Sequence, residues 1–303
     1  MTSMYAPMQA RRARGFTLVE TILVIVIMGV IGAIVAVFIR APVQGYVDTR
    51  ARAAATDEAD LALRRIARDL RLALPNSVRV NDDGNAVEFL LTKTGGRYLT
   101  LDDDVDKFPI LDFDNPANSS FTAVGGTMRH IQPGDFIVVY NLGNPEDSES
   151  DAYRYVKNGS AINIARVASV EGPASSNPVV KMDNNPFATQ ATPIRSPSDR
   201  FQVVTGPVAY VCEQGRDGNN VLVRYWGYPI AQTQQTPPKG ESGGAPQRAV
   251  IASRVADCDK VFRYGSDATR RSALVILNLA LRAGNDNDAL VRLASQVHVD
   301  NTP

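Results

Sequence analysis

A single carboxylate interrupts a long apolar stretch near the start of the chain. Glu20 lies within residues 16–39, and residues 21–39 contain no charged side chain. A charge at the centre of a membrane helix costs about 2.5–3.5 kcal/mol, so Glu20 needs either a counter-charge or a position at the membrane interface. Cleavage between Gly15 and Phe16 would create an α-amino group four residues before Glu20. In a stack of identical N-termini, that amine pairs with the Glu20 carboxylate of a neighbour.

A second group of carboxylates has the chemistry of a calcium site. Calcium binds carboxylate oxygens, and the candidates Asp102, Asp104 and Asp106 belong to a cluster that includes Asp103, with Asp112 and Asp114 nearby. Their spacing lacks the central glycine and final glutamate of an EF-hand loop. A solvated acidic loop is therefore the alternative to a calcium site, and we expect no other cofactor.

The sequence shows no catalytic constellation. It contains no Gly-x-Ser-x-Gly elbow, no phosphate-binding glycine loop followed by lysine, and no His-Glu-x-x-His zinc pair. The two histidines, His130 and His298, are predicted to lie beside or within strands. Trp226, Tyr225 and Tyr228 are predicted to pack within or beside a strand. We therefore expect a protein that is not an enzyme.

The charge balance argues against nucleic acid as a partner. The chain has 32 basic and 32 acidic residues. The first fifteen residues carry three arginines and no acid, so the remainder has 29 basic and 32 acidic residues. This remainder provides no general basic field for a phosphate backbone.

The two cysteines allow one disulfide. Cys212 and Cys258 both follow the apolar stretch, in a part of the chain expected to lie in an oxidising compartment. We predict a bridge between them, with two separate buried thiols as the alternative. The positions of the histidines give no zinc-ligand spacing with these cysteines, so no metal is expected there.

The apolar stretch has the length of a membrane span. Nineteen helical residues extend about 28 Å, and the hydrocarbon core of a bilayer is about 30 Å thick. Its many Val and Ile residues must form a helix in lipid, where each main-chain group needs a partner within the segment. Arg11, Arg12 and Arg14 place the N-terminus in the cytoplasm, so the remainder is predicted to lie in the periplasm of a Gram-negative cell.

The helical pattern continues beyond the membrane. Pro42 predicts a kink or a fresh first turn. Residues 43–74 then follow a helical pattern that ends at Pro75 and Asn76. Two opposite-charge pairs four residues apart, Asp60 with Arg64 and Arg65 with Asp69, are predicted on its solvated side. One apolar face is expected to pack on the following domain, and it comprises Leu63, Ile66, Leu70, Ala73 and Leu74.

The rest of the chain reads as strands and turns. Asp83-Gly84 and Gly95-Gly96 predict turns between short strands, and the last two strands form a terminal hairpin. Residues 143–151, 173–197 and 231–246 are predicted loops. The fold class is α+β: a long N-terminal helix followed by an antiparallel β-sheet domain. The predicted strands are 78–80, 86–92, 97–101, 136–140, 161–167, 201–204, 208–212, 221–226, 261–264, 274–281 and 290–299.

The segment Gly15-Phe16-Thr17-Leu18-Val19-Glu20 resembles the type IV prepilin signature. In that family the prepilin peptidase, a membrane aspartic protease, cuts after the glycine and methylates the new N-terminal phenylalanine. The resemblance implies cleavage between Gly15 and Phe16, N-methylation of Phe16, and an assembly role for Glu20. A secretory signal would place its cleavage site after the apolar region. The implied domains are a leader (1–15), a transmembrane helix (16–39), its periplasmic continuation (40–75) and a β-rich periplasmic domain (76–303).

Other stretches are similar to the O-type minor prepilins of the mannose-sensitive haemagglutinin (MSHA) pilus. These stretches are residues 47–52, 56–60, 63–79, 206–212 and 296–303. The helix-then-β plan also resembles J-type minor pseudopilins of type II secretion. The resemblance implies a low-copy structural subunit that helps to initiate or cap a filament. Its implied partners are prepilin peptidase, other major and minor pilins, the inner-membrane assembly platform and membrane lipid. A membrane-anchored binding module or adhesin is the alternative from another class.

Overall fold

The computed structural model describes residues 15–103, 108–125, 131–143, 148–157, 159, 161–172, 177–241, 244–269, 272–284 and 289–303. The chain divides into two compact units, Met1–Ala51 and Arg52–Pro303. The predictions for Arg11, Arg12, Arg14, Asp104, Asp106 and His130 lie outside the described residues.

One helix, α1 (Leu18–Arg71), supplies all the α-helical structure of the described residues. It runs through Pro42, where the sequence predicted an interruption. Proline removes one main-chain hydrogen bond, but the residues on both sides continue the helix. The prediction of a fresh first turn is therefore wrong.

Within the second unit, α1 buries the face that the sequence predicted. Ala59, Leu63, Ile66 and Leu70 all lie in one hydrophobic core, which strands of the β-domain complete. The helix ends at Arg71, earlier than predicted, because the chain then bonds to a strand. The Leu74 amide donates to the Leu90 carbonyl oxygen at 2.8 Å, and the Thr92 amide donates to the Leu72 carbonyl oxygen at the same distance.

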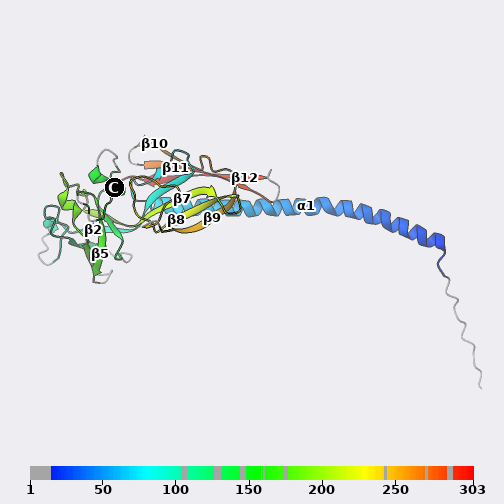
Figure 1. Ribbon diagram of the computed structural model, residues 1–303, viewed down its shortest axis with the longest axis horizontal. Helices are drawn as coiled ribbons and strands as arrows, with labels where there is room; N and C mark the ends of the chain where they lie inside the picture. Colours follow the sequence, from blue (N-terminus) through cyan, green and yellow to red (C-terminus); the bar gives the residue numbers. More distant parts are fainter. Residues whose placement is uncertain are drawn as a thin grey trace, which may run out of the picture. The chain divides into compact units, whose positions relative to one another are not determined.

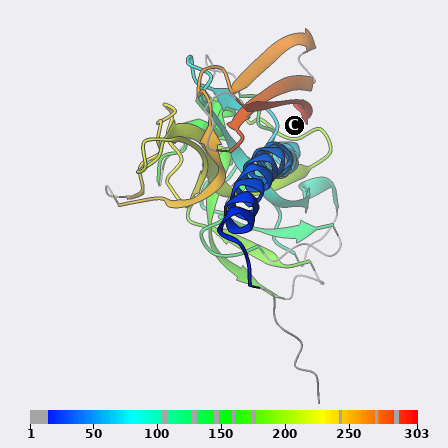
Figure 2. The same ribbon diagram turned by 90° about the vertical axis from the view of Figure 1, so that its right-hand side faces the viewer.

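An antiparallel sheet packs on this part of α1, which confirms the α+β class (Figure 1). Strands β7 to β9 and strands β10 to β12 flank the helix in Figure 2. The Lys260 amide donates to Asp83 O at 3.2 Å and the Phe262 amide to Gly84 O at 2.8 Å, which connects the β1–β2 turn to β10. The predicted terminal hairpin is confirmed as β11 and β12. The strands are β1 (Arg79–Val80), β2 (Ala86–Tyr98), β7 (Arg200–Gln214), β8 (Asn220–Trp226), β9 (Gln247–Val255), β10 (Phe262–Thr269), β11 (Ser272–Arg282) and β12 (Leu290–Asp300).

Six strands form a closed circuit that the sequence did not predict. The pairing runs β2–β3–β6–β5–β4–β7 and returns to β2, and every pair is antiparallel. The core of this small barrel is aromatic, with Tyr98, Phe113, Phe121, Phe187 and Phe201 buried together. The barrel-specific strands are β3 (Ser120–Val124), β4 (Phe136–Val138), β5 (Ile164–Glu171) and β6 (Val179–Met182). Four short 3₁₀ helices lie in its connections, at Leu101–Asp103, Ser148–Ser150, Ala152–Arg154 and Pro186–Thr189.

Several strand boundaries differ from the prediction. The sequence placed a turn at Gly95-Gly96, but β2 continues through both glycines and pairs them with Gln202 and Phe201. A Cβ atom at Gly95 would lie 3.0 Å from the Phe201 carbonyl oxygen, so the glycine permits close approach of β7. The strand predicted from residue 161 begins at Ile164, because Ala161 has a left-handed φ of 57°.

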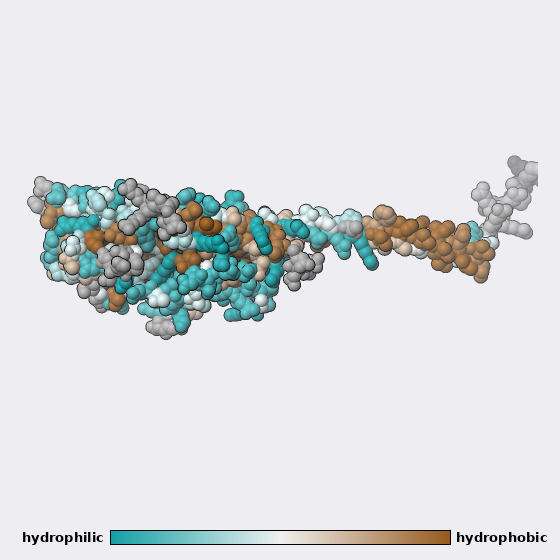
Figure 3. Space-filling view, turned by 90° about the horizontal axis from the view of Figure 1, so that it is seen from above, coloured by the Kyte–Doolittle hydropathy of each residue, from teal (hydrophilic) through white to brown (hydrophobic). Residues whose placement is uncertain are grey.

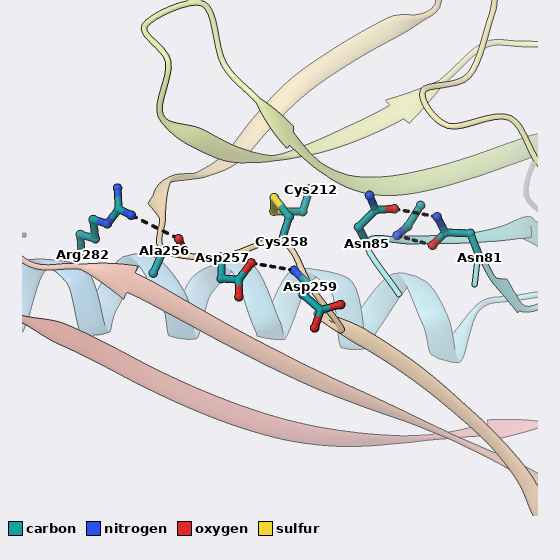
Figure 4. Close-up of a disulfide and its surroundings, with 9 residues drawn as sticks. Asn81, Asn85, Cys212, Ala256, Asp257, Cys258, Asp259 and Arg282 are labelled. Carbon is teal, nitrogen blue, oxygen red and sulfur yellow. Dashed lines mark hydrogen bonds between the residues drawn. A yellow bond between two sulfur atoms is a disulfide. The ribbon is translucent and has the colours of Figure 1, made fainter. Parts of the chain in front are cut away.

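Cys212 and Cys258 are joined by a disulfide (Figure 4). Cys212 lies in β7, and Cys258 lies in the connection between β9 and β10. Close to the bridge, the Asp257 carboxylate accepts a hydrogen bond from the Asp259 amide at 3.0 Å. The Arg282 guanidinium donates to the Ala256 carbonyl oxygen at 3.3 Å. The connection is therefore attached to both β7 and β11.

A buried ion pair attaches a loop to the first hairpin. Glu88 is 2% exposed and binds the guanidinium of Arg79, which also donates to the carbonyl oxygens of Gln232 and Ala231 at 2.6 and 2.9 Å. The Tyr228 hydroxyl donates to Glu88 Oε2 at 3.2 Å. Burial raises the pKa of Glu88 above its ordinary value of 4.5, and Arg79 opposes this rise.

The raised pKa of Glu88 predicts a pH dependence of stability. The folded domain holds the Glu88 proton more tightly than the unfolded chain, so this contribution decreases as the pH rises through the window above 4.5. In the wild type, the free energy of unfolding should fall as the pH rises through that window. Glu88→Gln should abolish this fall, because the glutamine side chain does not ionise. Urea titrations of the full chain in detergent, followed by the fluorescence of Trp226, would measure it. A wild-type minus variant difference that stays constant or rises with pH would refute the assignment, and the exposed Asp57→Asn is the control.

Candidate processing and assembly site

The predicted cleavage position lies just outside the helix. Thr17 is the N-cap of α1: its Oγ1 atom accepts from the Glu20 amide at 3.3 Å, and its carbonyl oxygen accepts from the Thr21 amide at 3.1 Å. The bond between Gly15 and Phe16 therefore precedes the first hydrogen-bonded turn. Phe16 is 82% exposed, and no atom lies within 4 Å of a Cβ built on Gly15.

Glu20 lies in the first turn of the helix. The positive end of the helix dipole favours a carboxylate there by about 0.3–1 kcal/mol. In one chain, four residues separate Phe16 from Glu20, which corresponds to about 6 Å along a helix axis. A neighbouring chain displaced by about that length would bring its terminal nitrogen to the level of this carboxylate. The sequence prediction of pairing between chains is compatible with this arrangement.

The first unit exposes its apolar side chains. Apolar residues from Leu18 to Ile39 are exposed along the helix, and they form the hydrophobic surface visible in Figure 3. Leaving each such side chain in water costs roughly 1.5–3 kcal/mol relative to burial. By length and composition, α1 is able to cross a membrane. Contact of this surface with lipid or with other helices would remove these side chains from water.

Comparison with known families decides the nature of this segment. Residues 10–36 match the family described as "Prokaryotic N-terminal methylation motif". The chain carries a prokaryotic N-terminal methylation motif. Comparisons with curated proteins and with solved structures gave no significant match.

The methylation motif supports a type IV pilin-like or pseudopilin subunit, which is a structural kind of protein. It implies processing by prepilin peptidase and assembly with other pilins. Together with the apolar helix α1, the motif fits a membrane-anchored subunit. The matched range contains Gly15, Phe16 and Glu20, the residues that the sequence analysis selected.

Asp103, which lies between the predicted calcium candidates, binds other groups. Asp103 binds the guanidinium of Arg97, and its Oδ2 accepts from the Thr100 amide at 2.8 Å. The hydrogen bond from Arg97 lowers the pKa of Asp103. Asp102 lies in the 3₁₀ helix Leu101–Asp103. Within the part of the chain that the structure describes, no three His, Cys, Asp or Glu side chains form a group able to hold a metal.

The remaining aromatic and histidine candidates lie on strands. His298 is exposed on β12, opposite Leu274. The Tyr225 hydroxyl donates to both carboxylate oxygens of Glu213, at 2.8 and 2.9 Å. The guanidinium of Arg224 lies 5.1 Å from the centre of the Trp226 ring. These contacts are those of sheet packing.

A buried charge cluster on α1 differs from the prediction. The sequence paired Asp69 with Arg65 on the solvated side, but Asp69 is only 5% exposed. Its Oδ2 atom accepts from the Tyr210 hydroxyl and from Arg224 Nε, both at 2.9 Å. Burial is the main cause that raises the pKa of Tyr210. The burial of Asp69 could have been predicted from the sequence, because this residue lies between Ile66 and Ala73 on the apolar face. The other predicted pair is confirmed, with Arg64 Nε 2.7 Å from Asp60 Oδ2.

Proposed function

We propose that the chain is a minor prepilin or pseudopilin that helps to initiate or cap a type IV pilus of the MSHA type. The observation that carries the proposal is the methylation motif at the start of α1, with an exposed Phe16 before the helix and Glu20 in its first turn. The apolar surface that follows supports a subunit that is stored in a membrane and later packed among other helices.

The proposed sequence of events has four steps. The apolar helix inserts with Arg11 to Arg14 in the cytoplasm and the β-domain in the periplasm. Prepilin peptidase then removes residues 1–15 and methylates the nitrogen of Phe16. Glu20 pairs with the terminal amine of a neighbouring subunit, and the apolar helices bundle. The β-domain then contacts other minor subunits or extracellular material.

Burial in the membrane favours contact between Glu20 of one subunit and the terminal amine of another. An isolated carboxylate in lipid is unfavourable by a few kcal/mol, and so is an isolated ammonium group. When the two groups meet at one depth, each supplies the counter-charge that the other lacks. The free energy of assembly therefore contains a term that a single subunit in the membrane does not have.

Assignment to the MSHA pilus rests on the five stretches that are similar to O-type minor prepilins. A J-type pseudopilin of type II secretion is the second candidate, and the plan of one helix followed by an antiparallel domain favours it equally. The genes that neighbour this one separate the two, because pilus and secretion subunits are encoded with different assembly components.

Blocking the cleavage site tests the proposed function. Gly15→Val should leave the leader attached, keep the protein in the membrane and exclude it from filaments sheared from the cell. The space around Gly15 is open in the chain itself, so the effect would arise in the peptidase and not in folding. Immunoblots of membrane and sheared fractions from the native host would measure it.

Gly45→Val is the matched control, because Gly45 also lies in open space and is outside the motif. It should be processed normally. Processing and filament incorporation of Gly15→Val at the wild-type level would contradict the proposal.

A further inference from the structure

The last strand of the chain, β12, has an unpaired edge. It pairs with β11 along its whole length, from Asp300 opposite Ser272 to Leu290 opposite Arg282. Among the strands that the structure describes, β11 is its only partner. The ladder has no register shift, and β12 contains neither proline nor lysine. Bulges, prolines and lysines are the features that usually prevent the edge of a sheet from pairing with another chain, so this edge is open to an added strand.

One hydrogen bond fixes the direction of the main-chain groups of β12. The Ala283 amide donates to the Ala289 carbonyl oxygen at 2.7 Å, directly beyond the ends of β11 and β12. Hydrogen-bonded and non-hydrogen-bonded pairs alternate in an antiparallel ladder, so every second residue after Ala289 directs its N–H and C=O groups toward β11. The residues between them direct both groups outward from the sheet, and all of their side chains are exposed. They are Leu290, Arg292, Ala294, Gln296, His298 and Asp300.

Other edges of the same sheet are covered by the chain itself. Helix α1 meets β9 at Ser253, whose amide and hydroxyl donate to Glu58 Oε1 at 2.6 and 2.8 Å. The β1–β2 turn bonds to the start of β10, where the Phe262 amide donates to the Gly84 carbonyl oxygen. Within the described parts of the chain, no residue makes a comparable bond to the outward main-chain groups of β12. These groups are therefore complementary to another strand.

The hydrophobic core reaches this edge without closing there. Val297 and Val299 are buried in the core that α1 and the strands share. Val291 and Leu293 point to the same side of β12 and pack on that core, but they are only partly buried. An added strand would place alternate side chains on this side, next to those of β12. Apolar residues at these positions would extend the cover over the core.

The exposed side of β12 carries opposite charges near its two ends. Arg292 and Asp300 are both exposed, and neither forms an ion pair with a described residue. In an antiparallel partner, the residue opposite Asp300 comes first and the residue opposite Arg292 follows eight positions later. Opposite charges that face each other across a strand pair stabilise it, and like charges destabilise it. The complementary strand is therefore basic at its start and acidic at its end.

We propose that the outer edge of β12 binds an extended segment of a different protein as an added antiparallel strand. This segment has a basic residue opposite Asp300 and, eight positions later, an acidic residue opposite Arg292. Apolar residues alternate between these two positions. Main-chain hydrogen bonds to β12 hold the segment, while the two charges and the apolar alternation fix its register.

A second copy of this chain has suitable charges but would run in the wrong direction. In an antiparallel pair centred on Gln296, Arg292 of each copy would lie opposite Asp300 of the other. This pairing reverses the second copy, together with the last turns of α1, beside which β12 runs lengthwise (Figure 1). Two chains that α1 anchors in one membrane have the same direction, so they cannot pair in this way. Only this exclusion rests on the proposed function.

Two matched peptides test the proposal. Both have the sequence Lys-Val-Thr-Val-Thr-Val-Thr-Val-Glu, with blocked ends, a fluorescent label and three N-methyl groups. Methylation of three valine nitrogens blocks the edge that faces away from β12, whereas methylation of the three threonine nitrogens blocks the edge that faces β12. Anisotropy titrations with the full chain in detergent should show binding of the first peptide and at least tenfold weaker binding of the second. Exchange of Lys and Glu in the first peptide should weaken its binding at least threefold.

A substitution in β12 supplies the matching test on the protein. Ala294→Pro removes an outward N–H group and no bond to β11, and edge strands accept proline at such positions. It should weaken binding of the first peptide at least tenfold, whereas Ala294→Thr keeps the N–H group and should bind like the wild type. Equal urea unfolding midpoints, followed by Trp226 fluorescence, would show that both variants fold. If the proline variant does not fold, the comparison of the two peptides decides.

The proposal is overturned if neither peptide binds, if both bind equally, or if a folded Ala294→Pro variant binds like the wild type. Dimers of the chain that Ala294→Pro dissociates would also overturn it, because a second copy would then occupy the edge. Peptide binding does not depend on processing of the N-terminus. A leader that is retained in native cells would therefore refute the proposed function and leave this proposal intact.

Discussion

Glu20→Gln is expected to reduce incorporation into filaments at least tenfold while residues 1–15 are still removed. The substitution keeps the size of the side chain and removes its charge, so the terminal amine of a neighbour loses its counter-charge in lipid. A difference of 1.4 kcal/mol corresponds to a factor of ten, and the membrane cost of one unpaired charge exceeds that value. Quantitative immunoblots of sheared filaments and of membranes would give the two amounts.

Two companion variants separate charge from shape at this position. Glu20→Asp keeps the charge on a shorter side chain and should retain part of the incorporation. Thr21→Ala changes the adjacent residue and should be close to wild type. Wild-type incorporation of Glu20→Gln would show that the carboxylate has no role in assembly.

Asp69→Ala is expected to lower the free energy of unfolding by about 3–5 kcal/mol, because it leaves a buried cation without its partner. The side chain of Arg224 is only 12% exposed, and its Nε atom donates to Asp69 at 2.9 Å. The Tyr210 hydroxyl also loses its acceptor. Urea unfolding of the full chain in detergent, followed by the fluorescence of the nearby Trp226, would measure the loss.

Asp60 provides the matched control on the same helix. It pairs with Arg64, whose side chain is 76% exposed, and an exposed pair contributes about 0–1 kcal/mol. Asp60→Ala should therefore change the free energy of unfolding much less than Asp69→Ala. Equal effects of the two substitutions would refute a buried, stabilising role for Asp69.

The elements with strong local patterns could be predicted from the sequence. The buried face of α1 repeats every three to four residues, and the structure buries Leu63, Ile66 and Leu70 as expected. The turn at Asp83-Gly84 and the terminal hairpin β11–β12 also follow from local signals. At Gly84 only glycine fits, since φ is 66° and a Cβ atom would lie 2.7 Å from the Phe262 carbonyl oxygen.

The barrel could not be predicted, because its strands are defined by their neighbours. β3 and β6 are only five and four residues long, and β6 lies within a segment that reads as a Pro- and Asn-rich loop. Each becomes a strand because it pairs with residues distant in the sequence, such as Phe121 with Val180. Gly95-Gly96 was predicted as a turn because the strand that pairs with it, β7, is distant in the sequence.

Some residues of the candidate site could be predicted from the sequence, and others could not. Gly15, Phe16 and Glu20 form a continuous motif, so the sequence alone selected them. The N-cap of Thr17 and the buried partners of Asp69 depend on three-dimensional geometry. The error at Asp69 arose because a charge pattern four residues apart was given more weight than the position of the residue on the apolar face.

The central claim is that proteolysis at the membrane creates the amine that Glu20 needs. Mass spectrometry of the N-terminal peptide, taken from protein of the native host, tests this claim most directly. We expect a peptide that begins at Phe16 and carries one methyl group on its nitrogen. A peptide that still contains Arg11 to Gly15, or a mature chain that begins after the apolar helix, would contradict it.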